Sequence, residues 1–287
     1  MNPSEMTPQP PSSEQIPPRL LYPPPQEAFL VLLVSLVAAL VGGAALVTLH
    51  KTGVFLTELL FLIPPWIYLR RKGYGLRRCL RWNNVPIALL LAAILIGLSL
   101  TVLLDEVDRI VNHFYPMPEE LQKVLLDFLE LKTLTDYLII GSGVILAAAI
   151  CEESLFRGFI QVSLEAYGPV NRAVLFSGLL FSLAHFNPWW MIQILILGVF
   201  LGFLSWRSNS SIPGMFIHAI NNGLALFTGG SMEGDKWAWY NMGHHVSPVI
   251  LIAAAALLFV GLKFFARLTE GSFRPDLTPT PEGDEVS

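Results

Sequence analysis

Residues 85–104 read VPIALLLAAILIGLSLTVLL, a stretch without a single charged side chain. At about 1.5 Å per residue, such a helix is long enough to cross the roughly 30 Å hydrocarbon core of a bilayer. The rest of the chain has the same character, because 53% of its residues are hydrophobic, 14% are charged and its mean hydropathy is +0.57. An ordinary soluble domain is less apolar. The sequence therefore predicts an all-α, polytopic membrane protein.

Eight apolar segments are expected to cross the membrane, so we predict about eight transmembrane helices. They are Ala28–Leu49, Val54–Leu69, Val85–Leu104, Tyr137 to about Leu164, Val170–Phe186, Trp189–Trp206, Ile212–Phe227 and Ser247–Ala266. Together they define a membrane domain of residues 28–268. The flanking residues 1–27, rich in Pro, Ser and Gln, and 269–287, which are Pro-rich and acidic, are predicted to be disordered.

Basic residues are distributed unequally between the predicted loops. The loop after the second segment holds six of them within residues 70–81. With this loop inside, thirteen of the 18 Lys and Arg residues fall on the inner side. The positive-inside rule then predicts that both termini are cytoplasmic. A net charge of −4 without a pooled basic patch gives no indication of nucleic-acid binding, so the expected partners are membrane lipid and membrane-bound chains.

Residues 105–136 connect the third and fourth predicted helices and are expected on the outer side of the membrane. This segment is acidic. Apolar residues recur within it at near-helical spacing from Leu121 to Leu131. This pattern predicts a helix that lies on the outer membrane interface. The two cysteines, Cys79 and Cys151, are too few for a disulfide framework or a thiolate metal site.

Two adjacent carboxylates, Glu152 and Glu153, lie deep in the fourth apolar segment. Ionisable side chains at membrane depth are costly, so they indicate a functional site. Residues 137–168 contain no proline and are expected to form one helix. Arg157 then pairs with Glu153 on one helix face, whereas Glu152 points about 100° away. One carboxylate is therefore paired and the other is free to accept a proton.

Three further polar side chains occur inside apolar segments. His185 could share a water molecule with Glu152, which would act as a general base, or could bind a metal. His218 and Asn222 are four residues apart on another predicted helix and therefore share a face. Their N–H groups could stabilise the oxyanion that forms when water adds to a peptide carbonyl.

Three motifs thus occur in order, each in an apolar segment: Glu-Glu-x-x-x-Arg at 152–157, Phe-x-x-x-His at 181–185 and His-x-x-x-Asn at 218–222. Together they resemble the CAAX protease and bacteriocin-processing (CPBP) family of intramembrane endopeptidases, which are related to the prenyl-protein CAAX protease. The resemblance covers about residues 138–227, and the first 130 residues add nothing to it. It implies a protease core at about residues 137–228, in which four helices carry the site.

The resemblance implies hydrolysis of peptide bonds in membrane-tethered proteins or peptides, with a prenylated CAAX tail as one candidate substrate. It assigns Glu152 as the base that activates water and gives it Glu153 and Arg157 as immediate partners. Prokaryotic members of the family commonly act on other substrates. We expect a multi-pass protein of a bacterial or archaeal cytoplasmic membrane rather than of the endoplasmic reticulum.

The same resemblance assigns His185 to orient the water or bind a metal, and His218 with Asn222 to form the oxyanion site. The family is described both as metal-dependent and as a glutamate-based protease. A divalent metal such as Zn²⁺ would take His185, His218 and Glu152 as ligands. The chain has no His-Glu-x-x-His helix, so its residues leave both mechanisms open.

Other functions and structural roles also fit these residues. An ion-coupled transporter would use the buried Glu and His side chains as a proton relay, and a non-catalytic membrane scaffold or immunity protein would use them for packing. Taken singly, Glu153 with Arg157 is an ion pair, and His218 with Asn222 is an interhelical hydrogen-bonding pair. Glu58 has no partner at a recognisable spacing, so we interpret it as solvated or interfacial.

Helix lengths raise one difficulty for a shared site. Glu152 is about 22 Å from the predicted outer end of its helix, but His185 is about 22 Å from Val170 and therefore closer to the outer face. The two side chains meet if the helix at Val170 begins outside the bilayer on the cytoplasmic side. They also meet if the Asn187-Pro188 turn stops short of the outer surface.

Overall fold

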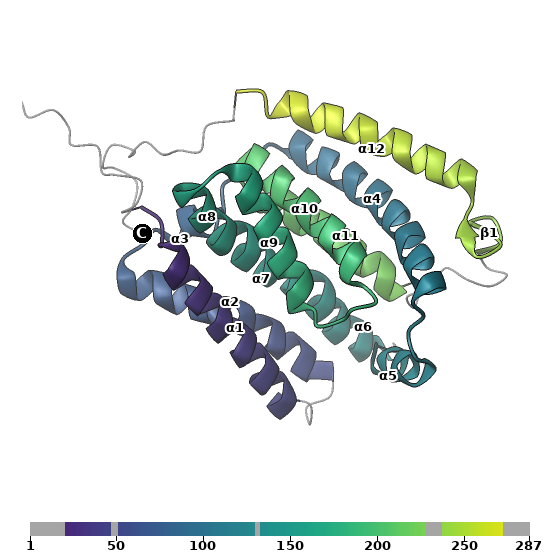
Figure 1. Cartoon of the computed structure of the whole chain (residues 1–287), viewed down its shortest axis with the longest axis horizontal. Helices are drawn as coiled ribbons and strands as arrows, with labels where there is room; N and C mark the ends of the chain where they lie inside the picture. The colour runs from purple at the N-terminus through teal and green to yellow at the C-terminus, as the bar shows by residue number, and fades with distance from the viewer. Residues whose placement is uncertain (1–20, 47–50, 130–132, 228–236, 272–287) are drawn as a thin grey trace, which may run out of the picture.

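The computed structural model describes residues 21–46, 51–129, 133–227 and 237–271 and shows helices packed side by side (Figure 1). In chain order, the elements are α1 (Pro25–Leu46), α2 (Lys51–Lys72), α3 (Leu76–Cys79), α4 (Ile87–Phe114), α5 (Glu119–Leu129), α6 (Leu134–Ile140), η3 (Gly141–Ala147), α7 (Ala148–Glu153), η4 (Ser154–Ile160), α8 (Gln161–Tyr167), α9 (Val170–Ala184), α10 (Met191–Ser208), α11 (Ile212–Phe227), β1 (Asn241–Met242), β2 (His245–Val246) and α12 (Pro248–Leu268). The predicted all-α class is confirmed.

A helix occupies each of the eight predicted membrane segments, but they differ in length and composition. Five are long and apolar enough to cross a bilayer: α1, α4, the continuous helix from α6 to α8, α10 and α12. Among the others, α9 is apolar but has only 15 residues, and α2 carries Glu58 together with Pro64 and Pro65 inside the helix. The chain is therefore a polytopic membrane protein, and eight crossings remain a prediction.

The third membrane helix is longer than its apolar sequence. We expected this helix to end at Leu104, but α4 continues through Asp105 and Glu106 to Phe114. The charged end is stabilised by the segment before α12, since the Tyr240 hydroxyl donates to Asp105 Oδ2 at 2.8 Å and the Val246 N–H donates to Glu106 Oε2 at 2.8 Å. Partners distant in sequence thus extend the helix beyond the limit that hydropathy gives.

The predicted interfacial helix corresponds to α5, Glu119–Leu129, which lies at one end of the bundle (Figure 1). Its first turn holds Glu119 and Glu120, which favour a helix N-terminus because they complement its dipole. Its Leu121 and Val124 side chains are exposed. Its position on the membrane interface remains a prediction.

The helix that carries the two adjacent carboxylates runs without a break from Leu134 to Tyr167, as the sequence predicts. It begins with a capping box, in which Asp136 N–H donates to the Thr133 hydroxyl and Thr133 N–H donates to Asp136 Oδ2. Two stretches of it, η3 and η4, are π-helical, and they lie on either side of α7. Such segments are rare and frequently occur at functional sites.

The meeting of Glu152 and His185 follows from the tight turn at Gly168-Pro169, which joins α8 to α9. Glu152 lies fifteen positions before Tyr167, the last residue of α8, and His185 lies fifteen positions after Val170, the first residue of α9. Because the two helices are antiparallel and share this turn, equal spacings along them bring Glu152 and His185 to the same depth, about 22 Å from the turn. The whole 34-residue helix is about 50 Å long, so it extends beyond a 30 Å apolar layer. This length is compatible with the arrangement in which the helix at Val170 begins outside the bilayer on the cytoplasmic side.

Close packing of glycines fixes α9 against α10. A Cβ added to Gly178 would lie 3.0 Å from Val199 N, and one added to Gly198 would lie 3.0 Å from Gly178 O. Small residues that let helix backbones approach closely are typical of membrane helix contacts. This contact sets the position of α9 and therefore of His185 at its C-terminal end.

The described part of the predicted N-terminal tail is packed against the bundle. Tyr22 is buried, the Ser163 hydroxyl donates to Pro23 O at 2.6 Å, and α1 already begins at Pro25. The predictions of disorder for residues 1–20 and 272–287 lie outside the described residues.

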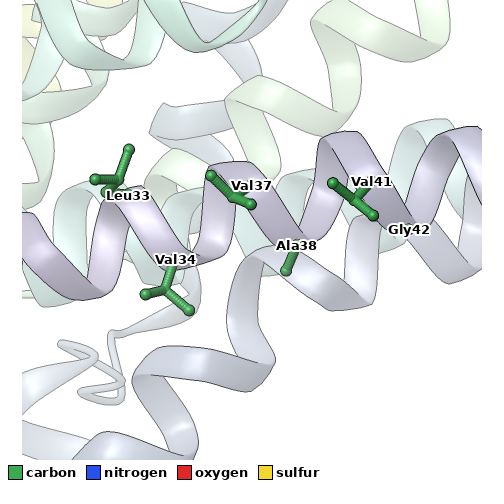
Figure 2. Close-up of a pocket in the computed structure, with 6 residues that line it drawn as sticks. All are labelled: Leu33, Val34, Val37, Ala38, Val41 and Gly42. Atoms are coloured by element: carbon green, nitrogen blue, oxygen red, sulfur yellow. The ribbon is translucent and has the colours of Figure 1, made fainter.

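The outward face of α1 is apolar, as expected for a helix that contacts acyl chains. A shallow hollow on this face is lined by α1 alone (Figure 2), through Leu33, Val34, Val37, Ala38, Val41 and Gly42. It contains no ionisable group and is separate from the carboxylate cluster on α7.

Candidate active site

Glu153 is the centre of a fully buried charged cluster. Arg157 Nη1 donates to Glu153 Oε1 at 2.8 Å, so the ion pair predicted from the i, i+4 spacing is present. Arg157 Nη2 donates to Gly198 O on α10 at 3.1 Å, and its guanidinium lies 4.1 Å from the centre of the Phe181 ring. A buried ion pair needs such additional partners because desolvation of both charges is costly. The pair therefore links the long helix to α9 and α10.

His218 contacts the same carboxylate from α11. Its Nδ1 is 3.1 Å from Glu153 Oε1, and the residue is 1% exposed. Because a carboxylate accepts, we assign the hydrogen to Nδ1. In the neutral ring, Nε2 is then an acceptor, and it donates only when His218 is protonated.

Glu152 lies at the edge of this cluster and faces His185. The side chain of Glu152 is 11% exposed and that of His185 is 28% exposed, whereas the side chain of Glu153 is fully buried. Glu152 Oε2 is 3.9 Å from His185 Nε2 and accepts no hydrogen bond from a described residue. The distance is too long for a direct hydrogen bond.

The tautomer of His185 is set by its own helix. Its Nδ1 lies 2.8 Å from Phe181 O, which can only accept, so Nδ1 carries the hydrogen. The neutral ring therefore presents the Nε2 lone pair to Glu152. A water molecule has two O–H groups and can therefore donate to both of these acceptors at once.

Phe181 explains the spacing of the second motif. Its ring is edge-on to His185 at 4.8 Å and to His218 at 5.5 Å, measured between ring centres. It is fully buried and also contacts the Arg157 guanidinium. Its backbone carbonyl orients one imidazole and its ring supports both.

Asn222 lies one turn after His218 on α11, and its Nδ2 donates to Val144 O at 2.9 Å. Val144 belongs to η3, on the helix that carries the carboxylates. The amide group has a second N–H, which this bond leaves available for another acceptor. The structure thus brings α7, α9 and α11 together through all three predicted motifs.

Glu58 is a member of the cluster that the sequence did not reveal. It lies on α2, which packs against α7, and its carboxyl group is within hydrogen-bonding reach of Glu152. The Oε2 atoms of both residues are buried and receive no hydrogen bond from a described residue. We had interpreted Glu58 as solvated or interfacial; its buried carboxyl oxygen contradicts the first alternative, and its depth in the membrane is not tested. Its only sequence signal was a lone acidic residue within an apolar segment.

The predicted metal ligands do not form a metal site in the described residues. No group of three or more His, Cys, Asp or Glu side chains there has the arrangement that holds a metal ion. His218 directs Nδ1 to Glu153 and His185 directs Nδ1 to Phe181 O, so each neutral ring keeps the lone pair on Nε2. Metal dependence remains a prediction, and no step below uses a metal.

Residues 134–224 match a family model described as type II CAAX prenyl endopeptidase Rce1-like. Through these residues the chain is similar to the CAAX protease family. The matched segment begins at the first residue of α6 and ends within α11, so it contains all three motifs and excludes Glu58. Neither the curated proteins nor the solved structures contain a match to the chain. The family supports a CAAX-type intramembrane endopeptidase in general.

Proposed function

We propose that this chain hydrolyses peptide bonds of membrane-tethered substrates with a water molecule held between Glu152 and His185. The observation that carries the proposal is the distance of 3.9 Å between Glu152 Oε2 and His185 Nε2, which both accept hydrogen bonds. The orientation of the His185 ring is set by its Nδ1–H, which donates to Phe181 O. A water that donates to both acceptors keeps its oxygen lone pairs directed away from them, toward a substrate carbonyl.

In the first step, the water oxygen forms a bond to the carbonyl carbon and Glu152 takes one water proton. The carbonyl oxygen becomes an oxyanion, which needs donors placed in advance. The second Asn222 N–H is one such donor, and His218 Nε2–H becomes another when its ring is protonated. In the second step, the C–N bond breaks and the proton held by Glu152 passes to the leaving nitrogen.

Glu153 and Arg157 act by holding the site rather than by touching the substrate. Both are fully buried, and together they contact α9 through Phe181, α10 through Gly198 and α11 through His218. This arrangement fixes the imidazole of His218 and the helix turn that carries Glu152. We expect their removal to disturb the geometry of the whole site.

Glu58 is proposed to share one proton with Glu152. A carboxyl group that keeps its proton can donate it in a hydrogen bond to a neighbouring carboxylate, which only accepts. When Glu58 carries that proton, it donates to Glu152 and leaves Glu152 charged and able to accept a proton from water.

The proposal is tested with the purified chain and a reporter peptide anchored in a bilayer. Wild-type protein should cleave the reporter, and His185→Ala should slow cleavage by about 10²–10⁴-fold, the usual contribution of a group that positions or accepts a proton. If His185→Ala cleaves as fast as the wild type, the water site between Glu152 and His185 is not the catalytic one. Proton movement into liposomes without any cleavage would instead favour the transporter.

A further inference from the structure

A polar seam runs between α10 and the continuous helix from α6 to α8. Arg157 Nη2 donates to Gly198 O on α10 at 3.1 Å. One turn later, Gln161 Nε2 donates to Gly202 O at 2.9 Å. Ser205 follows Gly202 by three residues and therefore lies on the same face of α10. The side chains of Arg157, Gln161 and Ser205 are fully buried, so each polar atom in this seam needs a partner inside the protein.

Two buried oxygen atoms beside this seam, Ser205 Oγ and Glu153 Oε2, make no hydrogen bond to a described residue. The other oxygen of the carboxylate, Glu153 Oε1, is held by Arg157 and His218. Both atoms lie beside Gly214 on α11, where a Cβ would be 2.9 Å from Glu153 Oε2 and 3.2 Å from Ser205 Oγ. Outside the α11 backbone, the next atom is Glu153 Cδ at 3.7 Å. Since both distances start from one point, the two oxygens are at most about 6 Å apart.

The Ser205 hydroxyl differs from that of Ser99, which is also buried within a helix. Ser99 Oγ donates to Leu95 O at 2.7 Å, the carbonyl one turn earlier in the same helix. Such a bond satisfies a buried serine locally. Ser205 makes no such bond, and its Oγ lies instead beside Gly214 of the neighbouring helix.

A water molecule fits the chemistry of the two unpaired oxygens. The Ser205 hydroxyl needs an acceptor and the Glu153 carboxylate needs a donor, and one water supplies both. Two hydrogen bonds of about 2.8 Å each bridge a separation of up to about 5.5 Å. A cation would lie close to the Arg157 guanidinium, which already neutralises Glu153, so repulsion disfavours it.

We propose that one buried water molecule is bound beside Gly214, where it accepts a hydrogen bond from Ser205 Oγ and donates one to Glu153 Oε2. Arg157 and His218 hold Glu153 Oε1, and the water holds Oε2, so the carboxylate is fixed against rotation about its terminal bond. Ser205 is thus a positioning residue that acts on Glu153 through the water. The site is built from buried contacts alone and does not depend on the hydrolysis proposed above.

The direct test is a crystal structure of the full chain, grown in a lipid phase and at a resolution that shows ordered water. We expect a density peak within about 2.6–3.2 Å of both Ser205 Oγ and Glu153 Oε2. The structure of Ser205→Ala should lack this peak, because the water loses one of its two partners.

Thermal unfolding in detergent gives a second measurement. Ser205→Ala removes the partner of a buried water and leaves Glu153 Oε2 unpaired, so the Tm should fall by about 2–4 °C. Ser99→Ala is the matched control, since it removes a buried hydroxyl that bonds to its own helix. It should change the Tm by less than about 1 °C.

Three results would overturn the proposal. One is the absence of the peak from the wild-type structure, with or without a direct bond between Ser205 and Glu153. The second is a peak that persists in Ser205→Ala, which would mean that other groups hold the water. The third is an equal change of Tm in Ser205→Ala and Ser99→Ala, which would mean that both hydroxyls are satisfied within their own helices.

Discussion

Glu152 and Glu153 are neighbours in the chain, but their carboxylates have different surroundings. Glu153 is fully buried and is held by Arg157 and His218, whereas Glu152 is partly exposed and faces His185 and Glu58. The sequence predicted this division, because one residue of helix turns the side chain by about 100°. Which helix would contact Glu152 was not predictable, since Glu58 is 94 positions earlier and belongs to no local pattern.

The first prediction at the residue scale concerns Glu58. In Glu58→Gln the amide N–H replaces the donated proton, so the rate of reporter cleavage should stay within a few-fold of wild type. In Glu58→Leu the hydrogen bond to a charged carboxylate is lost, which should lower kcat/KM by about 10–100-fold. Equal activity of the Leu variant and the wild type would show that Glu58 does not assist Glu152.

The second concerns Gly214, which packs against the buried carboxylate. A Cβ at this position would lie 2.9 Å from Glu153 Oε2 and 3.2 Å from Ser205 Oγ. Gly214→Ala should therefore displace Glu153, destabilise the fold by about 1–3 kcal/mol and lower activity. Gly223→Ala is the control on the same helix, because its nearest neighbour would be 3.6 Å away. Thermal unfolding and cleavage rates check both, and similar behaviour of the two variants would contradict the prediction.

At the scale of elements, α9 is positioned by its turn with α8 and by its contact with α10. Gly178→Ala would place Cβ 3.0 Å from Val199 N, so α9 must move away from α10. We expect a loss of stability of about 1–3 kcal/mol and slower cleavage, since His185 moves with α9. Gly141→Ala, whose Cβ would meet nothing within 4 Å, should leave the melting temperature and the cleavage rate close to wild type. A wild-type cleavage rate for Gly178→Ala would mean that this contact does not position His185.

The helices themselves were predictable because their apolar character and their stop signals are local. The Gly168-Pro169 turn gave the end of the long helix, and the motif spacing gave the pair of Glu153 with Arg157. The extension of α4 to Phe114 was not predictable, because its charged end depends on Tyr240 and Val246. The π-helical stretches around α7 also have no signal in the sequence that we could identify.

For the whole molecule, the basic residues predict that both termini lie on the cytoplasmic side. A cysteine at Glu270, which is exposed after α12, should react with a membrane-impermeant maleimide only after the membrane is opened. A cysteine at His244, exposed before α12, should react in intact cells. The native Cys79 and Cys151 are buried and should contribute little background. The reverse labelling pattern would contradict the predicted orientation.

The central claim is that Glu152 activates water for peptide hydrolysis, and one measurement tests it most directly. Single-turnover cleavage of a bilayer-anchored reporter peptide is compared for the wild type, Glu152→Gln and the exposed control Glu270→Gln. A glutamine keeps the shape of the side chain but accepts no proton, so Glu152→Gln should lower the rate by about 10²–10⁴-fold with an unchanged melting curve, while Glu270→Gln retains full activity. Cleavage by Glu152→Gln at the wild-type rate would contradict the account.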